Sequence, residues 1–277
     1  MLLGSHVSIA GGYLTALQEA KALDMDTIQI FSKNQRTWTE RIVTPEEAAL
    51  FKKNKPLFGV KQAFSHAIYL INLGTEDEAL AEKSIQALVH ELARCEALGL
   101  THTVLHPGAA GQGTTAEGIQ RIAKRLQQIF KLAGKGSSKI LLENTAGQGT
   151  SIGGKLEHLA ELLQQTGSQR LGVCIDTCHA FASGYDIRTE GGMQEFIDGF
   201  DALIGLNHLL CFHLNDSKGT LGSRLDRHEH IGQGELGTDP FRFILRHFNT
   251  IPKVLETSKE NNADSTNLNL LRQLALR

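Results

Sequence analysis

The segment 62–106 contains one complete strand–helix–strand unit: QAFSH at 62–66, EALAEKSIQALVHELARCEAL at 78–98, and TVLH at 103–106. The two short strings have the length of buried strands, whereas the long string has apolar residues at the spacing of an amphipathic helix. Parallel strands need such a crossover helix between them. We therefore predict a helix over Glu78–Leu98 that packs against a parallel sheet. Its apolar stripe consists of Ile85, Leu88, Leu92 and Cys95.

The same alternation of short apolar runs and longer amphipathic stretches continues along the whole chain. Eight such units in a chain of 277 residues predict an α/β fold, a TIM (β/α)8 barrel. A doubly wound open sheet with extra strands is the alternative. The predicted strands are Leu3–Ser8, Thr27–Ser32, Gln62–His66, Thr103–His106, Lys139–Glu143, Leu171–Asp176, Leu209–Leu214 and Lys253–Glu256.

The length and composition of the chain fit one domain. Hydrophobic residues make up 41% of it, and α/β barrels of this size remain single domains, so we expect one domain over 1–277. No run of eighteen or more apolar residues occurs. The N-terminal string Met1-Leu-Leu-Gly-Ser-His6 lacks the regions of a signal peptide. We therefore expect a soluble, cytoplasmic protein without membrane contact.

The cysteines argue against a disulfide-rich protein, and the net charge limits how the chain could bind nucleic acid. Four cysteines, at 95, 174, 178 and 211, form no Cys-x-x-Cys pair, which indicates reduced thiols rather than a disulfide framework. The 28 Lys and Arg residues against 30 Asp and Glu give a net charge of −2. Any attraction to nucleic acid must therefore come from a local basic face, and composition alone does not indicate a DNA-binding protein.

Ionisable residues gather at one end of the predicted strands. The carboxyl ends of the strands carry the active site in TIM barrels, and here six consecutive strands end in histidine or a carboxylate. A further pair, Asp226 and His228, follows in the loop after the seventh strand. The residues at the strand ends are His66, His106, Glu143, Asp176 with His179, His213 and Glu256.

Imidazole and carboxylate together are the ligand set of zinc or manganese. The nine side chains exceed what one tetrahedral ion can use, so we predict a site for two or three ions with a shared carboxylate. Each residue taken alone is better explained as a hydrogen-bonded structural group. Their occurrence on six strands in succession is what indicates a multinuclear metal site.

Not every histidine follows this pattern. His102 and His208 precede predicted strands, at the end opposite the expected active site. His6 lies inside the first strand, and we expect it in the barrel interior or beside the metal ligands. His230 competes with His228 as a ligand, and spacing alone does not separate the two.

Eight short strings of the sequence form a recognisable set. The two most specific are Glu143-Asn-Thr-Ala-Gly-Gln-Gly149 and Cys174-Ile-Asp-Thr-Cys-His-Ala180. The others are Gly4-Ser-His-Val-Ser8, Lys33-Asn-Gln-Arg36, Tyr69-Leu-Ile-Asn-Leu-Gly74, His106-Pro-Gly108, His213-Leu-Asn-Asp216 and Asp226-Arg-His228. Together they resemble the endonuclease IV family of apurinic/apyrimidinic endonucleases. The resemblance runs from about residue 3 to residue 257.

The resemblance implies a xylose-isomerase-like TIM barrel with three zinc ions, although manganese also suits such ligands. Glu143 would bridge the first two ions, and His228 would be the ligand instead of His230. The implied sets are His66, His106 and Glu143 for the first ion, Glu143, Asp176, His213 and Glu256 for the second, and His179, Asp226 and His228 for the third.

The resemblance also implies the reaction, which is hydrolysis of duplex DNA on the 5′ side of an abasic site. A hydroxide shared by two zinc ions would attack the phosphorus, and the third zinc would stabilise the departing 3′ oxygen. The products would be a 3′-hydroxyl and a 5′-deoxyribose phosphate, and damaged 3′ ends would be trimmed at the same site. Glu143 is the expected catalytic residue because it bridges two ions. A monomer with no obligate protein partner is expected.

Lesion recognition is expected from loops beside this site. The resemblance assigns Arg36, Tyr69 and Leu70 to the DNA, where such side chains fill the gap left by an extruded nucleotide. Tyr69 and Leu70 are equally consistent with core residues at the start of a helix. Four basic residues of the same loops are expected to contact phosphates, namely Lys33, Lys218, Arg224 and Arg227. For Lys218, Arg224 and Arg227 the alternative is an ordinary solvated loop.

Two rival functions share parts of this pattern. A sugar isomerase or epimerase uses the same barrel and the same ligand types, but it normally needs only one or two metal ions and has no use for the third set or for Tyr69. A catalytically inert damage-binding protein would keep the loops without the complete ligand set. One departure from the expected pattern is Ala67-Ile68 after His66, where more polar residues are expected.

Overall fold

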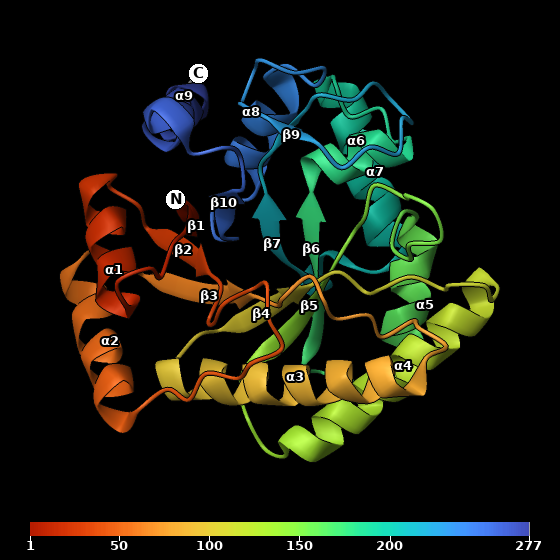
Figure 1. The fold of residues 1–277 in the computed structure, drawn as a ribbon. Helices are drawn as coiled ribbons and strands as arrows, with labels where there is room; N and C mark the ends of the chain where they lie inside the picture. The colour runs from red at the N-terminus through yellow and green to blue at the C-terminus, as the bar shows by residue number, and fades with distance from the viewer. Residues whose placement is uncertain (277) are drawn as a thin grey trace.

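The computed structural model describes residues 1–276 and contains a closed barrel of eight parallel strands (Figure 1). The TIM-barrel prediction is therefore confirmed, and the open-sheet alternative is wrong. Arg277, the last residue of the expected domain, lies outside the described residues. The barrel strands are β1 (Leu3–Val7), β2 (Thr27–Ile30), β3 (Gln62–His66), β4 (His102–Leu105), β5 (Lys139–Glu143), β6 (Leu171–Asp176), β7 (Leu209–His213) and β10 (Lys253–Leu255).

Helices surround the barrel as a ring, in the order of the chain (Figure 1). The predicted helix Glu78–Leu98 has the expected bounds: Asp77 caps its first turn, and Gly99 ends it in the left-handed conformation, with φ 67°. Helix α9 completes the ring beside α1. The helices are α1 (Tyr13–Ala22), α2 (Pro45–Leu57), α3 (Glu78–Leu98), α4 (Thr115–Ala133), α5 (Leu156–Thr166), α6 (Thr177–Ser183), α7 (Glu190–Leu203), α8 (Asp239–His247) and α9 (Ala263–Leu276).

Two separate cores hold the barrel together. The larger one lies between the strands and the helices, whereas a small apolar plug fills the barrel interior. Each member of the plug precedes an expected metal ligand by two positions, and residues two apart on a strand point to the same side. The ligands therefore form the next layer inside the barrel, above the plug. The plug consists of Phe64, Val104, Leu141, Cys174, Cys211 and Val254.

The fourth barrel strand begins one residue earlier than predicted and therefore includes His102. The predicted strand over Thr103–His106 instead begins at His102, which is buried and stacks on Phe64 with ring centroids 4.3 Å apart. The prediction that His102 precedes the strand is wrong by one residue. The residue still lies at the end of the barrel opposite the ligand layer.

A small feature that the sequence did not predict shapes the loop after β7. Strands β8 (Asp216–Ser217) and β9 (His228–Glu229) form an antiparallel pair. The buried carboxylate of Asp216 accepts hydrogen bonds from the backbone N–H groups of Gly232, Gly234 and Leu236 at 2.9, 3.0 and 2.9 Å. This pairing fixes the segment that carries Asp226 and His228 over the barrel.

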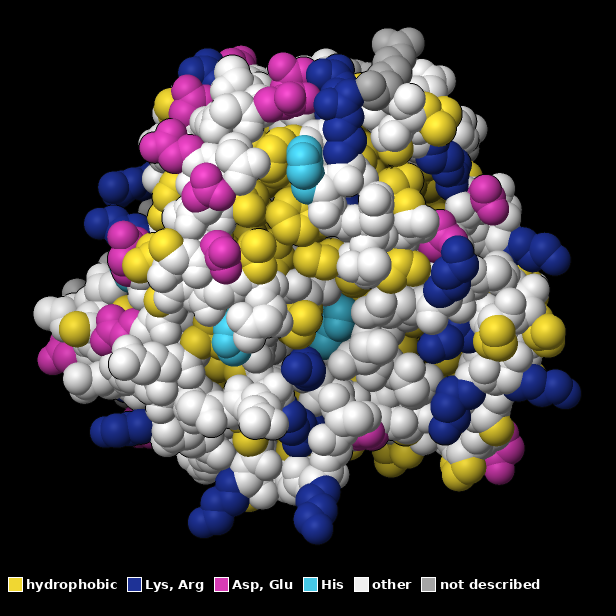
Figure 2. All heavy atoms as spheres, turned by 180° about the vertical axis from the view of Figure 1, so that it is seen from behind, with side chains coloured by type: hydrophobic (Ala, Val, Ile, Leu, Met, Phe, Trp, Pro, Cys, Tyr) yellow, Lys and Arg dark blue, Asp and Glu magenta, His cyan; other side chains and the backbone are white. Residues whose placement is uncertain are grey.

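Figure 2 shows the face of the molecule that lies behind the view of Figure 1. Acidic and basic side chains both occur around the edge of this face, with apolar side chains between them. Among residues 1–276, no helix combines the length and the apolarity needed to cross a membrane.

Candidate metal centre

The first ligand group consists of His66, His106 and Glu143. His66 Nε2 and His106 Nε2 lie 3.2 Å and 3.0 Å from the same oxygen, Glu143 Oε2. His66 donates from Nδ1 to the carbonyl oxygen of Ala67 at 2.6 Å, which leaves the lone pair of Nε2 for a ligand. A backbone carbonyl therefore orients this imidazole, so the position needs no polar side chain, and Ala67 and Ile68 are buried.

The second group gathers three carboxylates around one buried imidazole. His213 Nδ1 lies 2.9 Å from Glu143 Oε1, 3.1 Å from Glu256 Oε2 and 3.9 Å from Asp176 Oδ2. The four ligand atoms all lie within 4.8 Å of one another. Three carboxylates at this separation repel each other unless positive charge lies between them. The arrangement fits a bound cation.

The side chains beside this group orient its ligands. Gln29 accepts from His213 Nε2 at 2.9 Å, which turns Nδ1 of that ring toward the carboxylates, and donates to Glu256 Oε1 at 2.5 Å. The amide of Gln29 also donates to His6 Nδ1 at 2.9 Å, so the expectation that His6 lies beside the ligands is confirmed. Asn215 donates to Asp176 Oδ2 at 2.6 Å. Sequence reasoning missed Gln29 and Asn215, although a polar residue inside a buried strand was a signal for Gln29.

The third group consists of His179, Asp226 and His228. Asp176 accepts from the backbone N–H of His179 at 2.8 Å, so the cap of α6 places this histidine one turn beyond β6. His179 Nε2 and His228 Nε2 lie 3.2 Å and 3.4 Å from Asp226 Oδ1. His230 lies outside the group, because its Nδ1 accepts from Asn267 at 3.1 Å.

The protonation pattern of the third group tests whether a cation fits. His179 and His228 each direct Nδ1 to a backbone carbonyl, at 3.0 and 3.3 Å. Their Nε2 atoms are buried and have no hydrogen-bond partner in the described part of the chain. Each Nε2 lies beside a carboxylate oxygen of Asp226 and needs a proton or a cation between the two atoms, because an unprotonated nitrogen facing a carboxylate is costly in a buried site. A metal ion bound by all three atoms would remove this cost, so the residues fit one.

Burial and charge act in opposite directions on these groups. Burial alone would raise the pKa of Glu143, but the imidazoles of His213 and His106 outweigh burial and hold this pKa well below its usual value. Burial alone would lower the pKa of His213, yet the carboxylates of Glu256 and Glu143 hold it well above its usual value. The carboxylates thus require positive charge beside them. Protons on the imidazoles and metal ions compete to supply it.

The structure brings the nine expected ligands together, from six barrel strands, helix α6 and the loop after β7, into the three groups that the resemblance implied. Glu143 belongs to two of them, because Oε2 faces the first group and Oε1 faces the second. The roles of these residues as ligands remain predictions.

The expected DNA-contacting residues lie at the rim of the same site. Tyr69 and Leu70 are 57% and 37% exposed in a turn after β3, so the alternative of core residues in a helix is wrong. The Tyr69 ring centroid lies 5.1 Å from that of His66. Arg36 is exposed, but Lys33 is only 2% exposed and donates to backbone carbonyls. The expectation that Lys33 contacts a phosphate is therefore wrong.

The remaining basic residues, Lys218, Arg224 and Arg227, are all exposed in the loop between β8 and β9. Exposure is what a phosphate contact and a solvated loop both require. Their contact with DNA stays a prediction.

Two hollows adjoin the metal centre. One, of about 240 Å³, is lined by Tyr69, His106, Thr145, His179 and Asp226 among others. The second, of about 590 Å³, is lined by residues that include His6, Phe31, Arg36, Arg41 and Lys259. The first hollow therefore offers space for a substrate at the ligands, and the second reaches the neighbourhood of the site through His6.

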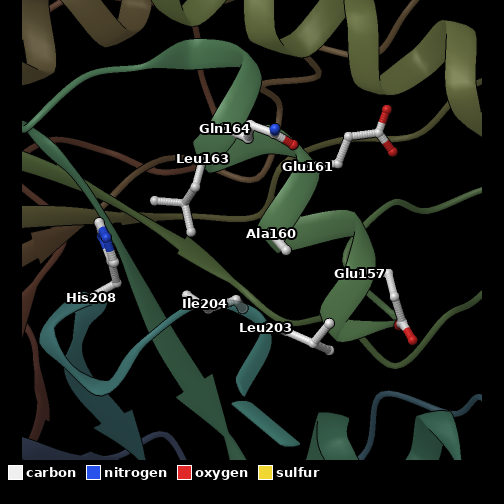
Figure 3. A pocket seen from close by; sticks show the side chains of 8 residues that line it. All are labelled: Glu157, Ala160, Glu161, Leu163, Gln164, Leu203, Ile204 and His208. Atoms are coloured by element: carbon white, nitrogen blue, oxygen red, sulfur yellow. The ribbon is translucent and has the colours of Figure 1, made fainter. Parts of the chain in front are cut away.

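A further groove lies between α5 and α7, away from this centre (Figure 3). Leu163, Leu203 and Ile204 line it together with the acidic side chains of Glu157 and Glu161. Within residues 1–276, no group of three ligand-type side chains converges there. The groove offers no comparable chemistry.

Comparisons with known proteins agree with this geometry. Residues 17–274 match a family described as "Xylose isomerase-like TIM barrel". A protein of Geobacter sp. (strain M21) named "Probable endonuclease 4" is 45% identical over 278 residues, which cover 99% of this chain and 98% of the relative. A protein of the same name from Chloroflexus aurantiacus (strain ATCC 29366 / DSM 635 / J-10-fl) is 44% identical over 277 residues, 98% of this chain and 97% of the relative.

Solved structures show the same likeness. The crystal structure of endonuclease IV from Thermus thermophilus superposes with a TM-score of 0.90 at 37% identity and covers 99% of this chain and 98% of that one. A D-tagatose 3-epimerase-like protein superposes with a TM-score of 0.77 at 18% identity and covers 99% of this chain and 97% of that one. At that identity only the fold is shared.

Proposed function

The chain belongs to the endonuclease IV family of xylose isomerase-like TIM barrels, and on this premise we propose that it hydrolyses duplex DNA on the 5′ side of abasic sites. The observation that carries the proposal is the third ligand group. His179 and His228 direct buried nitrogens without a hydrogen-bond partner among the described residues at Asp226, in addition to the two groups that share Glu143. Three converging groups of imidazole and carboxylate fit a trinuclear site.

We propose that this site holds three zinc ions, with manganese as an acceptable substitute at some positions. His66, His106 and Glu143 would hold one ion. The second would be held by Glu143, Asp176, His213 and Glu256, and the third by His179, Asp226 and His228. When bound, zinc acts as a Lewis acid that acidifies water to a pKa of about 7 and neutralises charge on a phosphate.

The chain's own side chains position these groups. The carboxylate of Glu143 is shared, because each of its oxygens faces a different group of imidazoles, and this makes it the residue on which the reaction depends most. Glu143 and His213 are fully buried, so bulk water would be excluded beneath a phosphate bound over them. The products would carry a 3′-hydroxyl and a 5′-deoxyribose phosphate, and blocked 3′ ends would be removed by the same phosphodiester chemistry.

Lesion recognition would come from the rim. An abasic nucleotide has no base to unstack, so its extrusion costs less than that of an intact nucleotide. The exposed side chains of Tyr69 and Leu70 would replace the lost stacking, and Arg36 would enter the minor groove. The hollow of about 240 Å³ beside His106 and Asp226 would receive the extruded sugar. A monomer would be sufficient, because every proposed ligand comes from one chain.

Incision of a duplex with a single tetrahydrofuran abasic analogue tests the proposal, since this analogue resists β-elimination. We expect a cut on its 5′ side that leaves a 3′-hydroxyl, is lost after metal stripping and returns with zinc. No incision by fully metallated protein would refute the proposed function. Epimerisation of a ketohexose would then support the sugar-enzyme alternative, and tight binding of abasic DNA without a cut would support the inert damage-binding protein.

A further inference from the structure

We propose that Lys33 is a positioning residue for DNA recognition, whose buried ammonium group holds the 31–44 connection in the shape that presents Arg36 to the substrate. This inference rests on the proposed function, because it places Arg36 at the DNA. The connection runs from β2 to α2 without any helix or strand of its own. Connections of this kind in compact domains are usually functional.

The ammonium group of Lys33 satisfies the backbone of its own loop. The side chain is only 1% exposed, and Nζ donates to the carbonyl oxygens of Thr37 and Thr39, both at 2.9 Å. The ammonium group also forms an ion pair with Glu40, whose Oε1 lies 3.6 Å from Nζ. Two of the three donors of this lysine are therefore satisfied by backbone carbonyls, and a carboxylate balances its charge. These contacts replace the hydrogen bonds that a helix or strand would have given the loop.

Glu40 connects this loop to the barrel. Its second oxygen accepts from Arg94 of α3, and Arg94 also donates to Glu91 Oε2 and to Ser32 Oγ, both at 2.7 Å. Glu91 in turn accepts from Ser65 at 2.5 Å. Ser65 directly precedes the expected ligand His66 on β3. Polar contacts thus tie the 31–44 connection to α3 and β3 of the barrel.

Arg36 lies inside the segment that Lys33 closes. It directly precedes the acceptor Thr37, and its backbone N–H donates to Asn34 Oδ1 at 2.9 Å. Its exposed side chain lines the hollow that also contains His6, which lies 3.8 Å from Glu256. A cation on an ordered loop binds DNA at a lower entropic cost than the same cation on a mobile one. Lys33 is too deeply buried to contact DNA itself.

The test compares two variants that each remove one positive charge. Lys33→Met keeps the apolar stem and removes the ammonium group, whereas Lys53→Met removes an exposed charge on α2. With the tetrahydrofuran duplex, Lys33→Met is expected to raise KM about tenfold and to leave kcat within about twofold, because the loop affects binding and not the metal centre. Lys53→Met should change neither quantity, and zinc content should stay the same in both variants.

Measuring the effect of Lys33→Met on KM in a protein that already carries Arg36→Ala tests whether Lys33 acts through Arg36. If Lys33 acts through Arg36, then Lys33→Met changes KM by less than about twofold in a protein that already carries Arg36→Ala. A tenfold effect in both backgrounds would overturn the proposal. An unchanged KM in the single variant, or a fall in kcat alone, would overturn it as well.

Limited trypsin digestion separates this inference from the proposed function. Trypsin should cut after Arg36 faster in native Lys33→Met than in the wild type, because the loop opens more often. Equal cutting would refute the positioning role even if the wild type incises DNA, and a wild type that does not incise DNA would refute the function alone. Should Lys33→Met fail to fold, Glu40→Gln takes its place and is expected to change KM and cutting in the same direction.

Discussion

The ligand layer inside the barrel and the 31–44 connection are positioned by different kinds of contact. The proposed ligands of the barrel strands stand at or just beyond strand ends, so the sheet itself fixes their spacing. The 31–44 connection has no regular backbone pairing, and its shape depends on single side chains such as Lys33. Damage to the first region should therefore stop chemistry, whereas damage to the second should weaken binding.

The largest effect is expected from Glu143→Ala. The change removes the carboxylate shared by two ligand groups and should lower kcat by at least about a thousandfold, beyond the 10–100-fold typical of residues that only orient a ligand. Binding of abasic DNA, measured by fluorescence anisotropy, should remain within about threefold of the wild type, because Glu143 is buried and does not face solvent. The control is Glu82→Ala, which removes a carboxylate from an exposed position of α3. Normal turnover by Glu143→Ala would contradict the proposed site.

A smaller effect on the same region is expected from Gln29→Leu. Gln29 holds the ring of His213 and one oxygen of Glu256, and loss of such a partner costs about 10–100-fold in metal affinity or activity. Zinc retained after dialysis against a weak chelator is the measurement. Gln62 lies on the neighbouring strand and its side chain donates to Thr101, away from the ligands, so Gln62→Leu should retain zinc like the wild type. Equal zinc retention by both variants would show that Gln29 does not orient the ligands.

The sequence predicted the ligand layer because the pattern behind it is local. Each ligand of the barrel strands ends or directly follows a short apolar run, so the predicted strand ends alone placed His106 and Glu143 at the catalytic end of the barrel. The bounds of β3, β5 and β6 were predicted correctly for the same reason. A polar residue inside a buried strand marked Gln29 as unusual, but its orienting role could not be predicted, because its partners lie on β1, β7 and the end of β10, far away in the sequence.

The loops were harder to predict, because their shape depends on partners that sequence spacing does not reveal. A lysine in a polar string predicts a solvated or phosphate-binding side chain, yet Lys33 is buried by its own loop and by Glu40. Strands β8 and β9 are two residues long, too short to show any periodicity. The predicted start of β4 is one residue late, so His102 was assigned to the preceding loop although it lies in the strand and stacks on Phe64.

Arg36→Ala tests whether the 31–44 connection contacts the DNA. Loss of this exposed cation should raise KM for abasic duplex about tenfold and should reduce the salt dependence of binding by roughly one phosphate contact. The kcat should stay within about twofold of the wild type, because Arg36 is not among the ligand groups. Titration of binding against salt concentration measures the change in affinity and in salt dependence. Unchanged affinity would show that the 31–44 connection does not contact the lesion.

The smallest effect is expected from pH, and it concerns the ligand layer alone. In metal-stripped protein, the carboxylates hold the pKa of His213 and His179 well above the ordinary 6.5, although burial acts against them. These groups bind more protons in the folded state, so their stabilisation is complete below about pH 6.5 and disappears as pH rises through the raised values. The melting temperature of stripped protein should fall as pH rises above about 6.5, by about 2–4 °C for each kcal/mol lost. Zinc-loaded protein should not show this fall, because the metal replaces the protons. The same fall with zinc bound would show that these imidazoles are not ligands.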